Sequence, residues 1–191
     1  MKTVAWSEGR WSREPVSIAQ EGSNLVAEAA AESDWWRITS YGFIHDDGHA
    51  LLKDFPNESA VEVSFILNYT EQFDQAGIFI TSDEKNWIKA GVEYCDGFPQ
   101  VGAVVTQVNS DWSVAPVAEW MNKEVTIRAS RSGDAVTIRA GINSDLRLVR
   151  VAPLNPTRTW QAGPMFCAPT RAGLKITFTN WSTGEADSAL H

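Results

Sequence analysis

Residues 74–113, DQAGIFITSDEKNWIKAGVEYCDGFPQVGAVVTQVNSDWS, decide the fold. Within them, Ile88, Ala90 and Val92 alternate with Lys89 and Glu93 at a period of two, as in a β-strand with two different faces. The runs QAGIFI and QVGAVVTQ alternate in the same way on either side of it. We therefore expect three consecutive antiparallel strands with an apolar inner face and a polar outer face.

The same two-residue period recurs along the chain, and no segment sustains the apolar spacing of a long helix. In AVEVSFILNY, residues 60–69, the odd-numbered positions are apolar, and VTIRASRSGDAVTIRAG, residues 125–141, predicts a hairpin that turns at Gly133. Frequent turn signals separate many short strands. The sequence predicts an all-β, two-layer antiparallel β-sandwich of jelly-roll type, with residues 1–191 as one domain. The small, polar tail at residues 185–191 is expected to fray.

Charge and apolar content restrict the partners. Sixteen Lys and Arg face 24 Asp and Glu, a formal charge of -8, which disfavours nucleic acid and anionic membranes. No apolar run is long enough to span a bilayer, and the N-terminus lacks a signal-peptide core, so we expect a cytoplasmic location. In that compartment Cys95 and Cys167 are expected to be thiols.

The outer face of the three strands carries the candidate binding site. Gly77, Gly91 and Gly102 are expected to open a shallow groove, because glycine in a strand often marks the close approach of a ligand. The candidate ligand-binding residues combine hydrogen-bonding groups with an apolar wall: Gln75, Lys89, Glu93, Thr106, Asp111, Trp112, Trp35 and Trp87. Such a surface suits a saccharide or a small polar metabolite. The alternative is that this face is only solvated.

Lys89 and Glu93 cannot satisfy each other. They are four residues apart on one strand, roughly 13 Å at the usual rise per residue. Each therefore needs a cross-strand partner, a ligand or water. Asp111 or Asp74 is the acidic residue that could meet Glu93 across a loop.

The motifs ESDWW, DQAGIFI, WIKAGVEY and VVTQVNSDWS resemble the regulation-of-enolase-like domains of unknown function, in the concanavalin A-like lectin and glucanase superfamily. The resemblance extends from about Trp11 to Trp181. It implies a jelly-roll sandwich with a concave sheet. The matching positions are Asp34, Trp35, Trp36, Asp74, Gln75, Gly77, Trp87, Lys89, Gly91, Glu93, Ser110, Asp111 and Trp112. Consecutive strand residues face opposite sides, so only one of Trp35 and Trp36 is expected to face the groove.

The sequence lacks the carboxylate pattern of a glucanase. A glucanase of this superfamily would carry Glu, Asp and Glu alternating on one strand, whereas VEYCDG places Asp96 on the opposite parity from Glu93. Glu93 is the candidate acid or base if the protein is an enzyme. His45 and His49 flank a turn and are interpreted as surface residues rather than metal ligands. No metal or cofactor is expected.

These observations favour a non-catalytic, lectin-like domain that recognises a saccharide or related polar metabolite on its concave sheet. A cytosolic protein-interaction or metabolic-regulatory domain is the first alternative. A glycoside hydrolase that uses Glu93 is the second.

Overall fold

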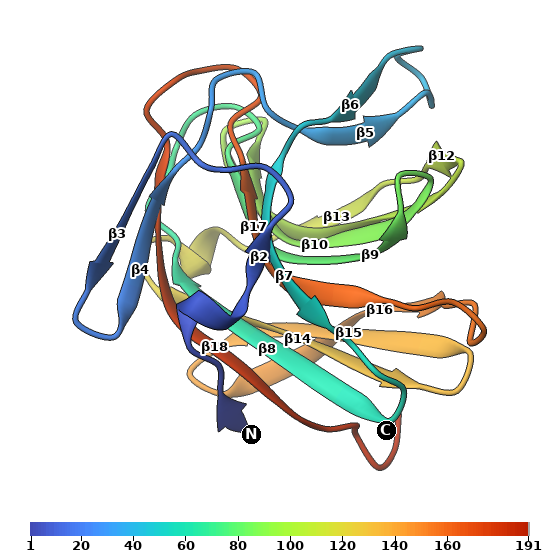
Figure 1. Cartoon of the computed structure of the whole chain (residues 1–191). Helices are drawn as coiled ribbons and strands as arrows, with labels where there is room; N and C mark the ends of the chain where they lie inside the picture. The colour runs from blue at the N-terminus through green and yellow to red at the C-terminus, as the bar shows by residue number, and fades with distance from the viewer. Residues whose placement is uncertain (191) are drawn as a thin grey trace.

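Two antiparallel sheets form the body of the computed structural model, which describes residues 1–190 (Figure 1). The first, here the β8 sheet, has the order β16 (Asp145–Pro153), β15 (Ala135–Ile142), β14 (Glu124–Ser132), β8 (Ser59–Ile66), β18 (Lys175–Glu185), β4 (Asn24–Glu28), β3 (Ser17–Glu21), with β1 (Lys2–Thr3) beside β18. The second, the β10 sheet, has the order β12 (Asn109–Ser110), β11 (Phe98–Gln107), β10 (Asn86–Cys95), β9 (Gln75–Asp83), β17 (Gln161–Cys167), β7 (His49–Asp54), β2 (Arg10–Trp11), with β13 (Ser113–Pro116) on β11. The all-β, two-layer antiparallel sandwich is confirmed.

The main core lies between the two sheets. From the β10 sheet it takes Ile78, Ile88 and Val92, and from the β8 sheet it takes residues such as Phe65 and Ile127. Each large apolar side chain buried in this way contributes about 1.5–3 kcal/mol. The parity predicted for both sheets is therefore confirmed, because the residues predicted to face inward are the ones that fill the core.

The three glycines of the outer face lie in one row across the β10 sheet. Gly77 is opposite Gly91, and Gly91 is opposite Gly102. A Cβ built on Gly91 would lie 2.1 Å from the carbonyl oxygen of Ala76 on β9. Close packing of the strands therefore requires glycine here, independently of any ligand.

A short hairpin covers the outer face of the β10 sheet (Figure 1). Its strands, β5 (Trp35–Arg37) and β6 (Ile44–Asp46), pair only with each other. Trp35 stacks on Phe79 of β9 with ring centroids 4.2 Å apart, and Trp87 of β10 packs beside both. The outer face is thus partly converted into a second, smaller apolar cluster.

Two single-turn 3-10 helices complete the described structure, η1 (Trp6–Glu8) and η2 (Ala118–Trp120). Across residues 1–190, no helix has the length and apolar character needed to cross a membrane.

The C-terminal tail contradicts the expectation that it frays. Asp187 forms ion pairs with Arg128 of β14 at 2.7 Å and with Arg139 of β15 at 2.5 Å. The Asp187 amide donates to Ser130, and the Leu190 carbonyl accepts from Arg139. These contacts hold the tail against the β8 sheet as far as Leu190, and His191 lies outside the described residues.

Candidate functional site

A pocket of ≈ 350 Å³ lies between the β5–β6 hairpin and the outer face of the β10 sheet. Its size falls in the range of small-molecule sites. Aromatic, acidic and a few other side chains line it: Glu32, Asp34, Trp36, Tyr41, Phe43, His45, Phe73, Lys89, Glu93, Val104, Trp112, Pro169 and Thr170. They come from six separate parts of the sequence, which only the completed fold brings together.

The floor of the pocket contains a buried ion pair. Lys89 Nζ lies 2.8 Å from Asp34 Oδ1, and only 6% of the Lys89 side chain is exposed. Burial acts to lower the pKa of Lys89. The charges of Asp34, Cys167 and Glu93, with the hydrogen bond to Asp34, together outweigh it, so the pKa is raised and the amine stays charged. Asp34 Oδ1 also accepts from the Trp35 amide at 2.7 Å and from Gln75 at 3.3 Å. Asp34 is thus the fixed partner that the sequence required for Lys89.

Glu93 has no such partner. Its Oε1 is buried and accepts no hydrogen bond from any of residues 1–190. Burial raises the pKa of Glu93 to about 7; the charge of Lys89 opposes the shift, and those of Asp34 and Asp96 add to it. A buried acceptor without a donor is costly, so the pocket presents one unsatisfied acidic group to whatever enters it.

The hairpin supplies much of the aromatic wall. Trp36 donates its ring N–H to the Thr39 carbonyl at 3.0 Å, which fixes the indole within the hairpin. Tyr41 stacks on Phe43 with centroids 5.3 Å apart, and Phe43 contacts His45 edge-on. Trp112, which is 43% exposed, closes the pocket from the β12–β13 side. Rings and hydrogen-bonding groups therefore meet around one space.

Four predicted ligand-binding residues lie at or beside this pocket. Lys89, Glu93 and Trp112 line it directly. Gln75 lines an adjoining hollow of ≈ 20 Å³ over Gly91, and its amide supports Asp34. The glycine row thus produces only a small hollow, and most of the space comes from the hairpin above the sheet.

The other four predicted ligand-binding residues do not line the pocket. Thr106 bonds Ser110 at 2.8 Å, and Asp111 caps the Val105 amide at 2.7 Å and pairs with Arg150. Trp35 and Trp87 are buried against Phe79, so they are core rather than wall. Trp36, not Trp35, faces the pocket. Each of these groups is instead engaged by another side chain or backbone group of the protein.

Sequence reasoning missed Tyr41, Phe43 and Phe73, which lie outside the strands that it considered. Asp34 was identified only through the family motif, without a role. An aromatic-rich turn between two short strands is the signal that could have found the hairpin residues. That pattern does not indicate which surface the hairpin covers.

The structure also places three other titratable groups discussed from the sequence: Asp74, Asp111 and His49. Asp74 pairs with Arg171, and Asp111 with Arg150. The acids that act on Glu93 are Asp34 and Asp96. His49 is fully buried, contrary to its interpretation as a surface residue, and its Nε2 accepts from the Ala30 amide at 2.9 Å.

Both cysteines are buried free thiols, as expected. Burial, with a smaller effect of the Glu93 carboxylate, raises the pKa of Cys95 to about 11. Burial also raises the pKa of Cys167. Neither thiol is activated for nucleophilic chemistry.

Comparison with known proteins gives full-length sequence relatives. A family model described as a protein of unknown function, DUF1349, matches residues 11–186. Regulation of enolase protein 1 from Saccharomyces cerevisiae is 36% identical over 194 residues, which cover 100% of this chain and 96% of that protein.

Solved structures give a near match and several remote ones. A functionally unknown protein from Saccharomyces cerevisiae has a TM-score of 0.89 at 33% identity, covering 97% of this chain and 100% of the other. A xylan beta-1,4-xylosidase from Bacillus halodurans has a TM-score of 0.72 at 13% identity, covering 97% of this chain and 39% of the enzyme. At that identity the likeness shows the fold alone.

Proposed function

The chain belongs to the DUF1349 family, and we propose that it is a non-catalytic binding domain that takes a saccharide or a related polar metabolite into the pocket beneath the β5–β6 hairpin. The family resemblance predicted from motifs such as ESDWW and WIKAGVEY is confirmed by the matches over nearly the whole chain.

One observation carries the proposal: a pocket of ≈ 350 Å³ combines aromatic walls with a buried carboxylate oxygen that has no donor within residues 1–190. A pyranose ring offers apolar C–H faces to Trp36 and Trp112 and hydroxyl donors to Glu93. Binding would thus satisfy an acceptor that the protein itself leaves unsatisfied.

The geometry supports binding more than hydrolysis. A two-carboxylate mechanism needs a second carboxyl group free to act on substrate or water. Of the other two acids that line the pocket, Glu32 is exposed at the rim. Asp34 accepts from Trp35, Gln75 and Lys89 on one oxygen. This is the role of a group that positions its neighbours.

Titration calorimetry of the purified chain with a panel of monosaccharides and disaccharides tests the proposal. We expect binding that Trp112→Ala weakens by about tenfold, the effect of losing one ring contact of roughly 1.4 kcal/mol. Phe98→Ala is the matched control, since Phe98 is 41% exposed and does not line the pocket. No heat with any panel member, and no change in ligand-observed NMR spectra, would refute saccharide binding.

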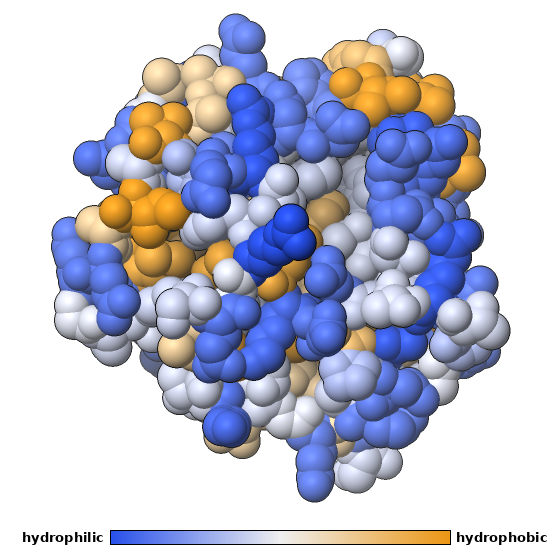
Figure 2. All heavy atoms as spheres, in the orientation of Figure 1, coloured by the Kyte–Doolittle hydropathy of each residue, from blue (hydrophilic) through white to orange (hydrophobic). Residues whose placement is uncertain are grey.

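A regulatory domain that acts through a protein partner is a second candidate, which the yeast relative's name favours. The hairpin tip is apolar and exposed, with Ile38 at 39%, Phe43 at 43% and Ile44 at 49% (Figure 2, upper right). The cytoplasmic location belongs to this proposal, since a partner enzyme of central metabolism would be found there.

Co-elution of the purified chain with enolase from the same organism, together with an enolase activity assay, tests this second function. We expect a complex that Phe43→Ser at the hairpin tip disrupts and Phe98→Ser does not. Separate elution at concentrations of about 100 μM, with unchanged enolase activity, would mean that the dissociation constant is too high for a stable regulatory complex. That result would refute this second function.

A further inference from the structure

We infer that the ligand of this pocket carries a protonated amine or a quaternary ammonium group, as an amino sugar or an amino alcohol does. This inference rests on the proposed binding function and narrows its ligand class.

The pocket has an excess of negative charge. Its lining includes Glu32, Asp34 and Glu93, against Lys89 as the one Lys or Arg. Asp34 already neutralises Lys89 across 2.8 Å. Two carboxyl groups are therefore left without a countercharge from the lining: Glu32 at the rim and Glu93 on the floor. His45 also lines the pocket, but its ring lies 3.3 Å from the Asp47 carboxylate. A phosphate or carboxylate ligand would be repelled, whereas a cation would be attracted.

Glu93 adds a directional requirement. Glu93 lines the pocket and forms no hydrogen bond or ion pair with the described chain, and a rotation of its carboxyl group would let an ammonium N–H or an adjacent hydroxyl of a ligand donate to it. A hydrogen bond between charged partners is roughly twice as strong as a neutral one. The site therefore gains most from a ligand that places both a positive charge and a donor above β10.

The aromatic walls favour the same ligand class. Five rings from three segments of the chain line the pocket: Trp36, Tyr41, Phe43, Phe73 and Trp112. The faces of such rings carry negative electrostatic potential and attract ammonium groups, most strongly where water is displaced. Neutral polyols gain from the same rings only through their apolar C–H faces.

Three hexoses share the same pyranose ring and differ in charge: glucosamine, glucose and glucose 6-phosphate. Comparing their affinities separates the contribution of the charge from that of the ring. By titration calorimetry at pH 7.5 and low salt, we expect glucosamine to bind at least about tenfold more tightly than glucose, and glucose 6-phosphate least well. Glu93→Gln should reduce the advantage of glucosamine to about threefold or less. Glu124→Gln is the matched control, because Glu124 is exposed on the β8 sheet. This variant should leave the advantage of glucosamine over glucose unchanged.

Choline and its neutral isostere 3,3-dimethylbutan-1-ol test the charge without a sugar ring. Preference for choline supports the inference, even where no hexose binds, and then directs the search to amino alcohols. Equal binding of glucose and glucosamine, or of choline and its isostere, overturns the inference and leaves the binding function intact. No binding by any of the five probes overturns both.

The pH dependence of choline binding gives an independent readout, because choline does not titrate. Glu93 has a pKa of about 7, so its uptake of a proton between pH 8 and pH 6 should weaken choline binding by up to about tenfold. The charged groups that act on Glu93 are Lys89 on the same strand, Asp34 before β5 and Asp96 after β10. A dependence that persists in Glu93→Gln would contradict the role of Glu93.

Discussion

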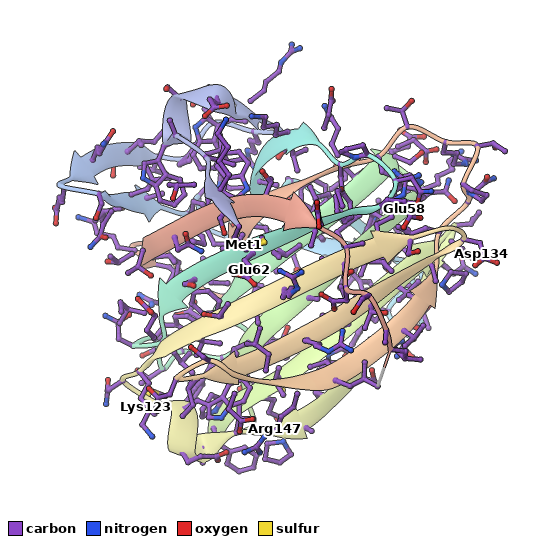
Figure 3. The ribbon with its side chains drawn as sticks, turned by 90° about the horizontal axis from the view of Figure 1, so that it is seen from below. Met1, Glu58, Glu62, Lys123, Asp134 and Arg147 are labelled. Atoms are coloured by element: carbon purple, nitrogen blue, oxygen red, sulfur yellow. The ribbon has the colours of Figure 1, made fainter. Side chains whose placement is uncertain are left out.

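The outer faces of the two sheets both carry charged side chains, yet they satisfy them differently. On the β8 sheet, Arg128 pairs with Glu62 at 2.8 Å and with Asp187 at 2.7 Å, and Arg139 pairs with the same Asp187 (Figure 3 labels Glu62 on this face). On the β10 sheet, Lys89 is paired with Asp34 but Glu93 is not paired.

The difference separates structural charges from functional ones. The groups on the β8 sheet form a network in which each acid named has a basic partner, and nothing in it needs a ligand. The β10 sheet leaves a buried acceptor unsatisfied at a pocket that the hairpin helps to line. Charge on a sheet face is therefore uninformative by itself. Buried polar atoms without a partner also occur on the β8 sheet, at Arg131, Thr179 and Trp181, so the site is marked by an unsatisfied carboxyl group that also lines a pocket.

Removing the buried cation should give the largest effect. Lys89→Met leaves the Asp34 carboxylate without its ion-pair partner, and we expect a loss of about 3 kcal/mol in the free energy of unfolding. Arg128→Met on the β8 sheet should cost only about 1 kcal/mol, because Asp187 keeps Arg139. Urea denaturation at pH 7 measures both. Equal losses would mean that the two faces do not differ.

Adding a methyl group to the glycine row should be the next largest effect. In Gly91→Ala the new Cβ would lie 2.1 Å from the Ala76 carbonyl oxygen, so β9 and β10 must move apart at a cost of about 2–3 kcal/mol. On the β8 sheet, Thr126→Ala should cost about 1 kcal/mol for the hydrogen bond with Ser64. A Gly91→Ala protein of unchanged stability would show that close strand packing does not require this glycine.

Neutralising Glu93 should stabilise the protein. Its folded-state pKa, about 7, lies above the ordinary glutamate value of 4.5, so the folded state binds more protons and stability falls as pH rises through this window. Glu93→Gln should therefore gain about 1–3 kcal/mol over wild type at pH 8, and the gain should shrink towards pH 5. Glu62→Gln should instead lose stability at pH 8, because it removes a partner of Arg128. A loss for both variants would contradict the unsatisfied state of Glu93.

Truncating Trp112 should have the smallest effect on folding. The side chain is 43% exposed, so we expect Trp112→Ala to change the free energy of unfolding by no more than about 0.5 kcal/mol. Leu148→Ala on β16, where Leu148 is 48% exposed, should behave alike. A loss well above that of Leu148→Ala would identify Trp112 as part of the core rather than of the pocket wall.

The sequence predicted the sandwich because alternation at a period of two is a local property. Ile88, Ala90 and Val92 had to face one side and Lys89 and Glu93 the other, whatever the rest of the chain did. The row of three glycines followed from the same parity. The need of Lys89 for a partner also followed, because a buried charge is costly wherever it lies.

The identity of each partner could not be predicted. Asp34 reaches Lys89 from 55 positions away, and Arg150 reaches Asp111 from 39. Such contacts depend on how the hairpin and the loops lie over the sheets. The choice between Trp35 and Trp36 likewise depended on which side of the hairpin meets Phe79. Local patterns fix the direction in which a side chain points, and distant segments decide what it meets.

The self-contained pairing of β5 with β6 has a consequence for native-state motion. Because neither strand adds to a large sheet, the hairpin can detach without breaking the ladders that hold the sandwich together. Its backbone amides should exchange with deuterated solvent through a local opening, faster than those of β8 or β10. An occupant held between hairpin and sheet would slow that exchange, so protection at residues 35–46 would report occupancy without knowledge of the occupant.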